Sequence, residues 1–141
     1  DLGKANYFSP KISFDEWKQY SSRAKINLNV VHELHAETFA TSTARPFELA
    51  ALGCCIVSSP YKGIEKWFEP NKEIFVANSS KEAIDLYQML MEDEDLRIKT
   101  GLAAQKRVQN EHSARHRIKQ IITIIQKHRG QNDEKTYNPN S

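Results

Sequence analysis

An arginine and a glutamate stand three residues apart at the predicted start of a short helix. Arg45 and Glu48 open a segment, residues 43–59, that continues to a glycine stop at Gly53 and then an apolar run. The first N–H groups of a helix lack intrahelical partners and favour anions, and Arg45 adds a fixed cation. Glu48 would repel phosphate, so it is expected to bind hydroxyl groups or a cation. Phosphate together with hydroxyls is the chemical profile of a nucleotide or a nucleotide sugar.

A simple ion pair between Arg45 and Glu48 is the alternative, because residues three apart on a helix are neighbours. Pro46 argues against it, since the residue before a proline is disfavoured in helical backbone. Arg45 is therefore expected to precede the helix and to be free to reach a ligand. Ser42 or Thr43 would cap the helix, and their hydroxyl and N–H groups could also bind phosphate.

Residues with metal-ligand chemistry lie just before this segment, at His32, Glu33, His35 and Glu37. The spacing is His-Glu-Leu-His, whereas His-Glu-x-x-His is the spacing that places two histidines on one helical face. We therefore expect no metal site here. A single histidine that contacts phosphate or a sugar hydroxyl fits the sequence better.

Composition limits the class of protein. The chain has 141 residues, enough for one domain, and a net charge of +2 that is too small to indicate nucleic-acid binding. No apolar run approaches the length of a transmembrane segment. Cys54 and Cys55 are adjacent within an apolar run, a spacing that rarely permits a disulfide, so reduced thiols and a cytoplasmic location are expected.

Strand and helix patterns alternate along the chain. Ser13 and Glu16 form a capping box before a helix predicted over residues 14–23. Strands are predicted at residues 6–8, 25–31, 54–57 and 73–77, and a loop at 32–41. Such alternation indicates an α/β domain, a Rossmann-like parallel sheet with flanking helices. Ligands bind such sheets at the carboxyl ends of the strands, where the loop at 32–41 and residues 42–48 would lie.

The C-terminal part is predicted to be helical. Helices are expected near residues 64–68, 79–91 and 95–111, with Gly101 tolerated at some cost in stability. A last helix begins at Ser113, and its apolar residues are expected to face inward: Ile118, Ile121, Ile122 and Ile125. Residues 1–129 form the domain in this prediction, and the polar tail over 130–141 is expected to be disordered.

The run Arg45-Pro46-Phe47-Glu48-Leu49-Ala50-Ala51-Leu52-Gly53 resembles the Arg-x-Phe-Glu-x-x-Ala-x-Gly segment of group 1 glycosyltransferase-like proteins related to the CgeB spore-maturation proteins. Residues 25–29 are similar to the strand before this segment, residues 64–74 to the segment after it, and residues 97–117 to the closing helices. The resemblance extends from about residue 14 to residue 125.

The resemblance implies the GT-B architecture, in which the C-terminal of two Rossmann-like domains binds the nucleotide-sugar donor. Glu48 would then hold the ribose hydroxyls, and the segment Ser42, Thr43, Ala44 and Arg45 would meet the diphosphate of a donor such as a UDP- or GDP-sugar. Many members of the wider superfamily carry a second glutamate eight residues before the one that matches Glu48, although the closer relatives commonly lack it. In this chain that position is Ala40.

The resemblance also implies that the domain is incomplete. Residues 6–8 look like its third strand, so the first two strands would be missing and a central sheet edge would be unpaired. An open edge invites a homodimer or strand exchange, and residues 1 to about 12 are expected to pack abnormally or to pair with another chain.

The predicted function is transfer of a sugar from a nucleotide-diphosphate donor to an unknown acceptor, with no cofactor and no metal held by the protein. Arg45 would stabilise the leaving diphosphate. A missing N-terminal domain would hold the acceptor, so this chain alone is expected to be inactive. The alternative is a catalytically inactive domain that binds a nucleotide or a partner protein, which the alanine at Ala40 favours.

Overall fold

A computed structural model describes residues 11–40 and 43–136, with side chains as far as residue 129. The predicted strand at residues 6–8 and the predicted cap at Ser42 lie outside the described residues. In chain order the elements are α1 (Phe14–Arg23), β1 (Asn27–Asn29), α2 (Glu33–Ala36), α3 (Arg45–Ala51), β2 (Ile56–Ser58), η1 (Ile64–Lys66), β3 (Phe75–Val76), α4 (Ser80–Glu92), α5 (Glu94–Arg107), η2 (Val108–His112) and α6 (Ala114–Thr136).

The three strands form one parallel sheet in the order β1-β2-β3. Leu28 of β1 lies opposite Val57 of β2, and Val57 lies opposite Phe75 of β3. Parallel strands need crossover connections, and helices supply them, as the sequence predicts. The α/β class with a parallel sheet and flanking helices is therefore confirmed.

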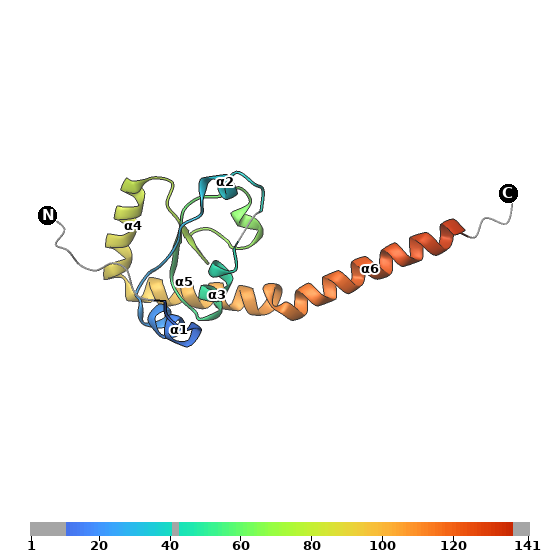
Figure 1. Cartoon of the computed structure of the whole chain (residues 1–141). Helices are drawn as coiled ribbons and strands as arrows, with labels where there is room; N and C mark the ends of the chain where they lie inside the picture. The colour runs from blue at the N-terminus through green and yellow to red at the C-terminus, as the bar shows by residue number, and fades with distance from the viewer. Residues whose placement is uncertain (1–10, 41–42, 137–141) are drawn as a thin grey trace.

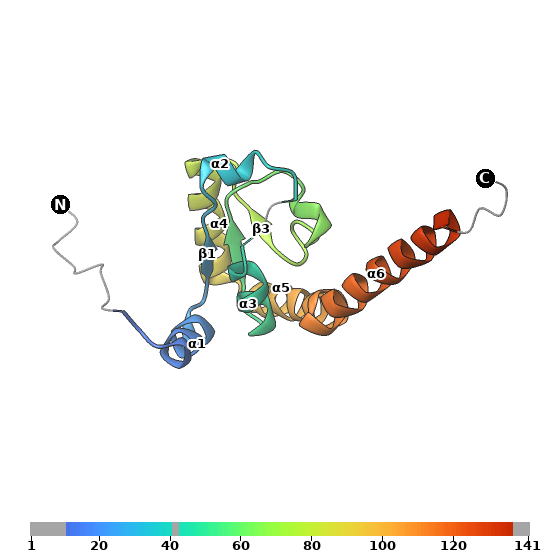
Figure 2. The ribbon, with the colours of Figure 1, turned by 45° about the vertical axis from the view of Figure 1, so that its right-hand side comes forward.

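The sheet is covered on both faces, which explains why β2 is apolar throughout. On one face Ile56 packs in a cluster with residues of α3, α5 and the segment around η1, and the half-buried Trp17 of α1 joins it. On the other face Val57 packs with Leu90 of α4. Figures 1 and 2 show α4 on one side of the strands and α3 with α5 on the other. Cys54 and Cys55 are buried thiols that form no disulfide. Cys54 packs in the cluster of Ile56, and Cys55 packs in the cluster of Val57.

Helix α5 crosses very close to the turn between α3 and β2. A Cβ atom on Gly101 would lie 2.1 Å from the carbonyl oxygen of Gly53, so only glycine permits this approach. Gln105 adds a hydrogen bond from its side-chain amide to the carbonyl of Ala51, 2.9 Å away. Gly101 is thus required by the packing of α5, whereas the sequence alone presents it as a cost to the helix.

Strand β1 has its polar side turned inward. Asn29 is 2% exposed, whereas Leu28 is 48% and Val30 is 78% exposed. Among the described residues β1 pairs only with β2, so its other edge carries no partner strand. The alternation of residues 25–31 predicts a strand correctly, but it is the asparagine side that packs in the domain.

Helix α6 leaves the body of the domain, as Figure 1 shows. The expectation that its isoleucines face inward is wrong, because Ile118, Ile121, Ile122 and Ile125 are each about half exposed. The helix contacts η2 at its first turns and then extends away, so no described element covers its later turns. The helix continues through Gly130 to Thr136. None of the described helices has the length and apolarity needed to cross a membrane.

Candidate functional site

The predicted site residues meet at one hollow beside the start of α3. Thr43, Ala44, Arg45 and Glu48 line it together with Asn29 and Val30, at the carboxyl end of β1, and its volume is about 410 Å³. The crossover from β1 to β2 therefore brings the residues of 43–48 to the sheet edge where ligands of α/β proteins bind. Ser42 lies outside the described residues.

Two expectations about the start of α3 are wrong. Arg45 is the first residue of the helix rather than a residue before it, because the residue before a proline is only disfavoured in helical backbone and Ala44 is helical as well. The N-cap is Ala44, which offers no side-chain hydrogen bond, in place of Ser42 or Thr43. Since α3 has seven residues, its dipole is weak, and most of the positive charge at this hollow comes from Arg45.

Arg45 and Glu48 are both exposed. Although they share a helix turn, no salt bridge or hydrogen bond joins them among the described residues. The ion pair that competes with ligand binding is thus not formed, although Arg45 is helical. Both side chains remain available to bind groups in the hollow.

A buried polar pair that the sequence did not predict involves Asn29, one of the residues that line this hollow. The side-chain amide of Asn29 donates to Ser58 Oγ at 2.9 Å, which ties the carboxyl ends of β1 and β2 together. Val31 continues this contact, because its N–H donates to Ser59 Oγ at 2.8 Å. Asn29 and Ser58 are polar residues at the ends of buried strands, where apolar residues would be expected. This is the signal in the sequence that could have indicated the pair. These bonds fix the backbone from which the site loop departs.

The loop that leads to α3 is held at Ala40. Ala40 has a φ of 55°, in the left-handed region that costs an L-residue energy. Its N–H donates to the carbonyl of Lys62 at 2.6 Å, and its carbonyl accepts from Trp67 Nε1 at 3.0 Å. Gly63 lies against it so closely that a Cβ atom there would be 2.7 Å from the Ala40 nitrogen. The backbone at Ala40 is thus both strained and tightly held.

Trp67 is held in turn by the end of η2 and the start of α6. His112 Nε2 lies 3.1 Å from the carbonyl oxygen of Trp67, and Arg117 lies 2.7 Å from His112 Nδ1 and over the Trp67 ring. A carbonyl only accepts and a guanidinium only donates, so His112 must be neutral with its proton on Nε2. Burial and the nearby Arg117 lower the pKa of His112 below its ordinary value of 6.5, which agrees with this assignment. We call Ala40, Trp67, His112 and Arg117 the clamp.

The residues with metal-ligand chemistry near His32 have a structural use. His32 is the N-cap of α2, and its Nδ1 accepts from the N–H of Leu34 at 3.3 Å. The rings of His32 and His35 meet edge to face, with centroids 6.3 Å apart. Within residues 11–40 and 43–136, no three potential ligands gather in a way that could hold a metal ion.

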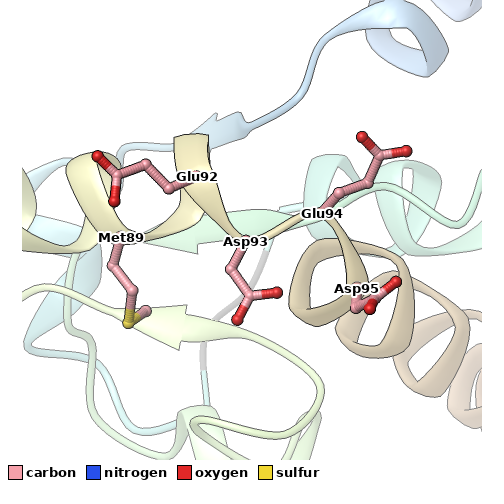
Figure 3. A pocket seen from close by; sticks show the side chains of 5 residues that line it. All are labelled: Met89, Glu92, Asp93, Glu94 and Asp95. Carbon is pink, nitrogen blue, oxygen red and sulfur yellow. The ribbon is translucent and has the colours of Figure 1, made fainter.

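A second hollow lies at the junction of α4 and α5, where Figure 3 shows the side chains around it. It is lined by Met89 and four consecutive acidic residues: Glu92, Asp93, Glu94 and Asp95. Asp93 caps α5 by accepting from the N–H of Leu96 at 2.8 Å, and the buried Arg97 donates to the carbonyl of Leu90. These acids thus build the turn between the helices, and their charge would repel a nucleotide diphosphate.

Comparison with protein families gives one match. A family model described as glycosyl transferase-like matches residues 3–123, which include the hollow beside α3, the clamp and the start of α6. A comparison with curated proteins finds no match. The matched range covers most of the 141 residues. The chain therefore belongs to the glycosyl transferase-like family.

Proposed function

We propose that this domain binds the nucleotide-sugar donor of a glycosyltransferase in the hollow beside α3. The observation that carries the proposal is the placement of Arg45 and Glu48, unpaired with each other, in one hollow at the carboxyl end of β1. The guanidinium of Arg45 suits a diphosphate, because it is planar, permanently charged and able to donate two parallel hydrogen bonds. The carboxylate of Glu48 suits the two hydroxyls of a ribose, which can donate to it.

In the proposed reaction the sugar leaves its diphosphate, and the negative charge that develops on the diphosphate is stabilised by Arg45 and nearby N–H groups. The rest of the site, including the acceptor, would be held by a second domain, as the family resemblance implies. Buried, unpaired Cys54 and Cys55 fit the reducing cytoplasm as the proposed location.

Thermal unfolding of the whole chain with UDP, GDP, ADP and CMP tests the proposal. A nucleotide that binds the folded state only should raise Tm by several degrees when it is present well above its Kd. Glu48→Ala and Arg45→Ala should each abolish this shift. Glu65→Ala and Arg115→Ala are matched controls, because both residues are exposed and lie away from the hollow, and they should keep it.

The second candidate is a domain that has lost catalysis and binds only a nucleotide or a partner protein. Ala40 favours it, because the family resemblance implies a glutamate at this position in many members of the wider superfamily, and this chain has an alanine there. If no nucleotide shifts Tm, the donor site is refuted and a protein-binding role takes its place. A shift that survives Glu48→Ala and Arg45→Ala would place the nucleotide elsewhere.

We also propose that the open edge of β1 pairs with a second copy of the chain. The outer edge of β1 has no described partner, and the exposed Leu28 and Val30 provide an apolar surface beside it. Sedimentation at increasing protein concentration should show a dimer, and Leu28→Lys with Val30→Lys should yield a monomer. Ile118→Lys on α6 is the control and should leave the dimer intact. A monomer at all concentrations would overturn this proposal.

A further inference from the structure

A third hollow shares no lining residue with the proposed donor site, and the family match assigns it no role. It has a volume of about 560 Å³ and lies between the loop at Ala40, η1 and the start of α6. Its apolar walls are the side chains of Phe39 and Trp67. Its polar lining consists mainly of nitrogen groups, from Lys66, His112, His116 and Arg117, with Gln120 and Glu111 at the side.

Arg117 is fixed in place and still has donors to offer. Its guanidinium lies over the Trp67 ring, 5.5 Å from the ring centroid, and donates to His112 Nδ1 at 2.7 Å and to Gln120 Oε1 at 2.8 Å. A guanidinium carries five N–H groups, so these two bonds leave three for another acceptor. An arginine held by three contacts loses little side-chain entropy when it binds a ligand.

The charge around the hollow is positive. Lys66 is exposed, and its ammonium lies 5.9 Å from the centre of the Phe39 ring. The one acid in the lining, Glu111, already pairs with Arg107 at 3.3 Å. Lys66 and Arg117 are therefore not balanced by a carboxylate in the lining, and an anion would balance them.

We propose that this hollow, the Trp67 pocket, binds a phosphate or carboxylate group carried on an apolar or aromatic body. Arg117 and Lys66 bind the anion, because both line the hollow and present donors and positive charge to it. Phe39 and Trp67 contact the apolar body of the ligand. The pocket is separate from the hollow at Arg45 and Glu48, so this proposal does not depend on nucleotide-sugar binding.

Trp67 provides a direct readout of this pocket. The chain has two tryptophans, Trp17 and Trp67, so Trp17→Phe leaves Trp67 as the only indole reporter. We expect phenyl phosphate, at constant ionic strength, to change the fluorescence of this variant with a saturable curve. Benzoate tests carboxylate against phosphate, inorganic phosphate tests the anion without a ring, and phenol tests the ring without an anion. The ring-bearing anions should bind more tightly than either inorganic phosphate or phenol.

Two lysine variants make the test specific. Lys66→Gln should weaken the binding of phenyl phosphate about three- to fivefold, as expected when one exposed charged contact is lost. Lys119→Gln removes the same charge from α6 outside the lining and should change nothing. Arg117→Lys keeps the charge but loses the fork of donors, so it should weaken binding more than Lys66→Gln does. Circular dichroism checks that this variant folds. The proposal is overturned by a signal that does not saturate, by phenol binding as tightly as phenyl phosphate, or by equal effects of Lys66→Gln and Lys119→Gln.

Discussion

The two sides of α3 are built in opposite ways. Glu48 and Arg45 are exposed and make no ion pair with each other, whereas Phe47, between them in the sequence, packs against Trp67, Phe68 and His112. The three ring contacts of Phe47 have centroid distances of 5.4 to 5.7 Å. One side is thus available to a ligand, and the other holds the helix to η1 and η2. The proposed site is therefore positioned by residues that do not take part in it.

Replacement of Phe47 should give the largest effect on stability. Phe47→Ala removes a half-buried ring and its three aromatic neighbours, so we expect a loss of about 2–3 kcal/mol in the free energy of unfolding. Glu48→Ala should change that free energy by less than about 0.5 kcal/mol, because its side chain is exposed. Urea denaturation measures both. Similar losses for the two variants would contradict the division of α3 into a packed and a free side.

The features that the sequence predicts correctly arise from local patterns. The parallel sheet, the capping box of Ser13 with Glu16 and the placement of residues 43–48 beside the sheet edge follow from local patterns, and the structure bears them out. Local patterns have a physical cause within a few residues, such as a cap or the alternation of a strand.

The clamp could not be predicted, because it joins residues far apart in the chain. Trp67 meets Ala40 across 27 positions and His112 across 45. Each residue alone gives only a weak signal, and no spacing rule links them. The isoleucines of α6 misled the prediction for a related reason. Their spacing of three and four shows that they share a face, but it does not show what covers that face.

Replacement of Gly63 tests whether the close contact between Gly63 and Ala40 contributes to stability. Gly63 has a φ of 82°, and a methyl group there would lie 2.7 Å from the Ala40 nitrogen, so Gly63→Ala should cost about 2 kcal/mol of stability. Gly53→Ala is the matched control. Its φ is 74°, but its methyl group would meet only the side chain of Gln105, at 3.6 Å or more. Chemical denaturation should show the larger loss for Gly63→Ala, and equal losses would mean that contact with Ala40 contributes nothing.

The clamp should also make stability depend on pH, in a direction set by His112. Burial lowers the pKa of His112 in the folded state below 6.5, so below that pH the unfolded chain takes up the proton more readily. The contribution of His112 to stability is therefore complete above about pH 6.5 and is lost as the pH falls through the lowered pKa.

Denaturation of the wild type and of His112→Asn over pH 5 to 8 isolates this effect from the other histidines. The wild type should lose stability relative to the variant as the pH falls. Glu48→Ala, on the free side of α3, should give the same pH profile as the wild type. A difference between the wild type and His112→Asn that stays constant with pH would refute the neutral assignment of His112.

Replacement of Ala40 should give a small effect, and it is the one change expected to stabilise the domain. Its φ of 55° costs about 1–2 kcal/mol for an L-residue, which glycine avoids. Glycine also raises the entropy of the unfolded chain, at a cost of about 0.4–1 kcal/mol. Ala40→Gly should therefore stabilise the domain by about 0.5 kcal/mol, measured by the shift of the urea midpoint. Its hydrogen bonds to Lys62 and Trp67 use backbone atoms and survive the change, so a loss of stability would mean that the methyl group, and not the backbone, holds the loop.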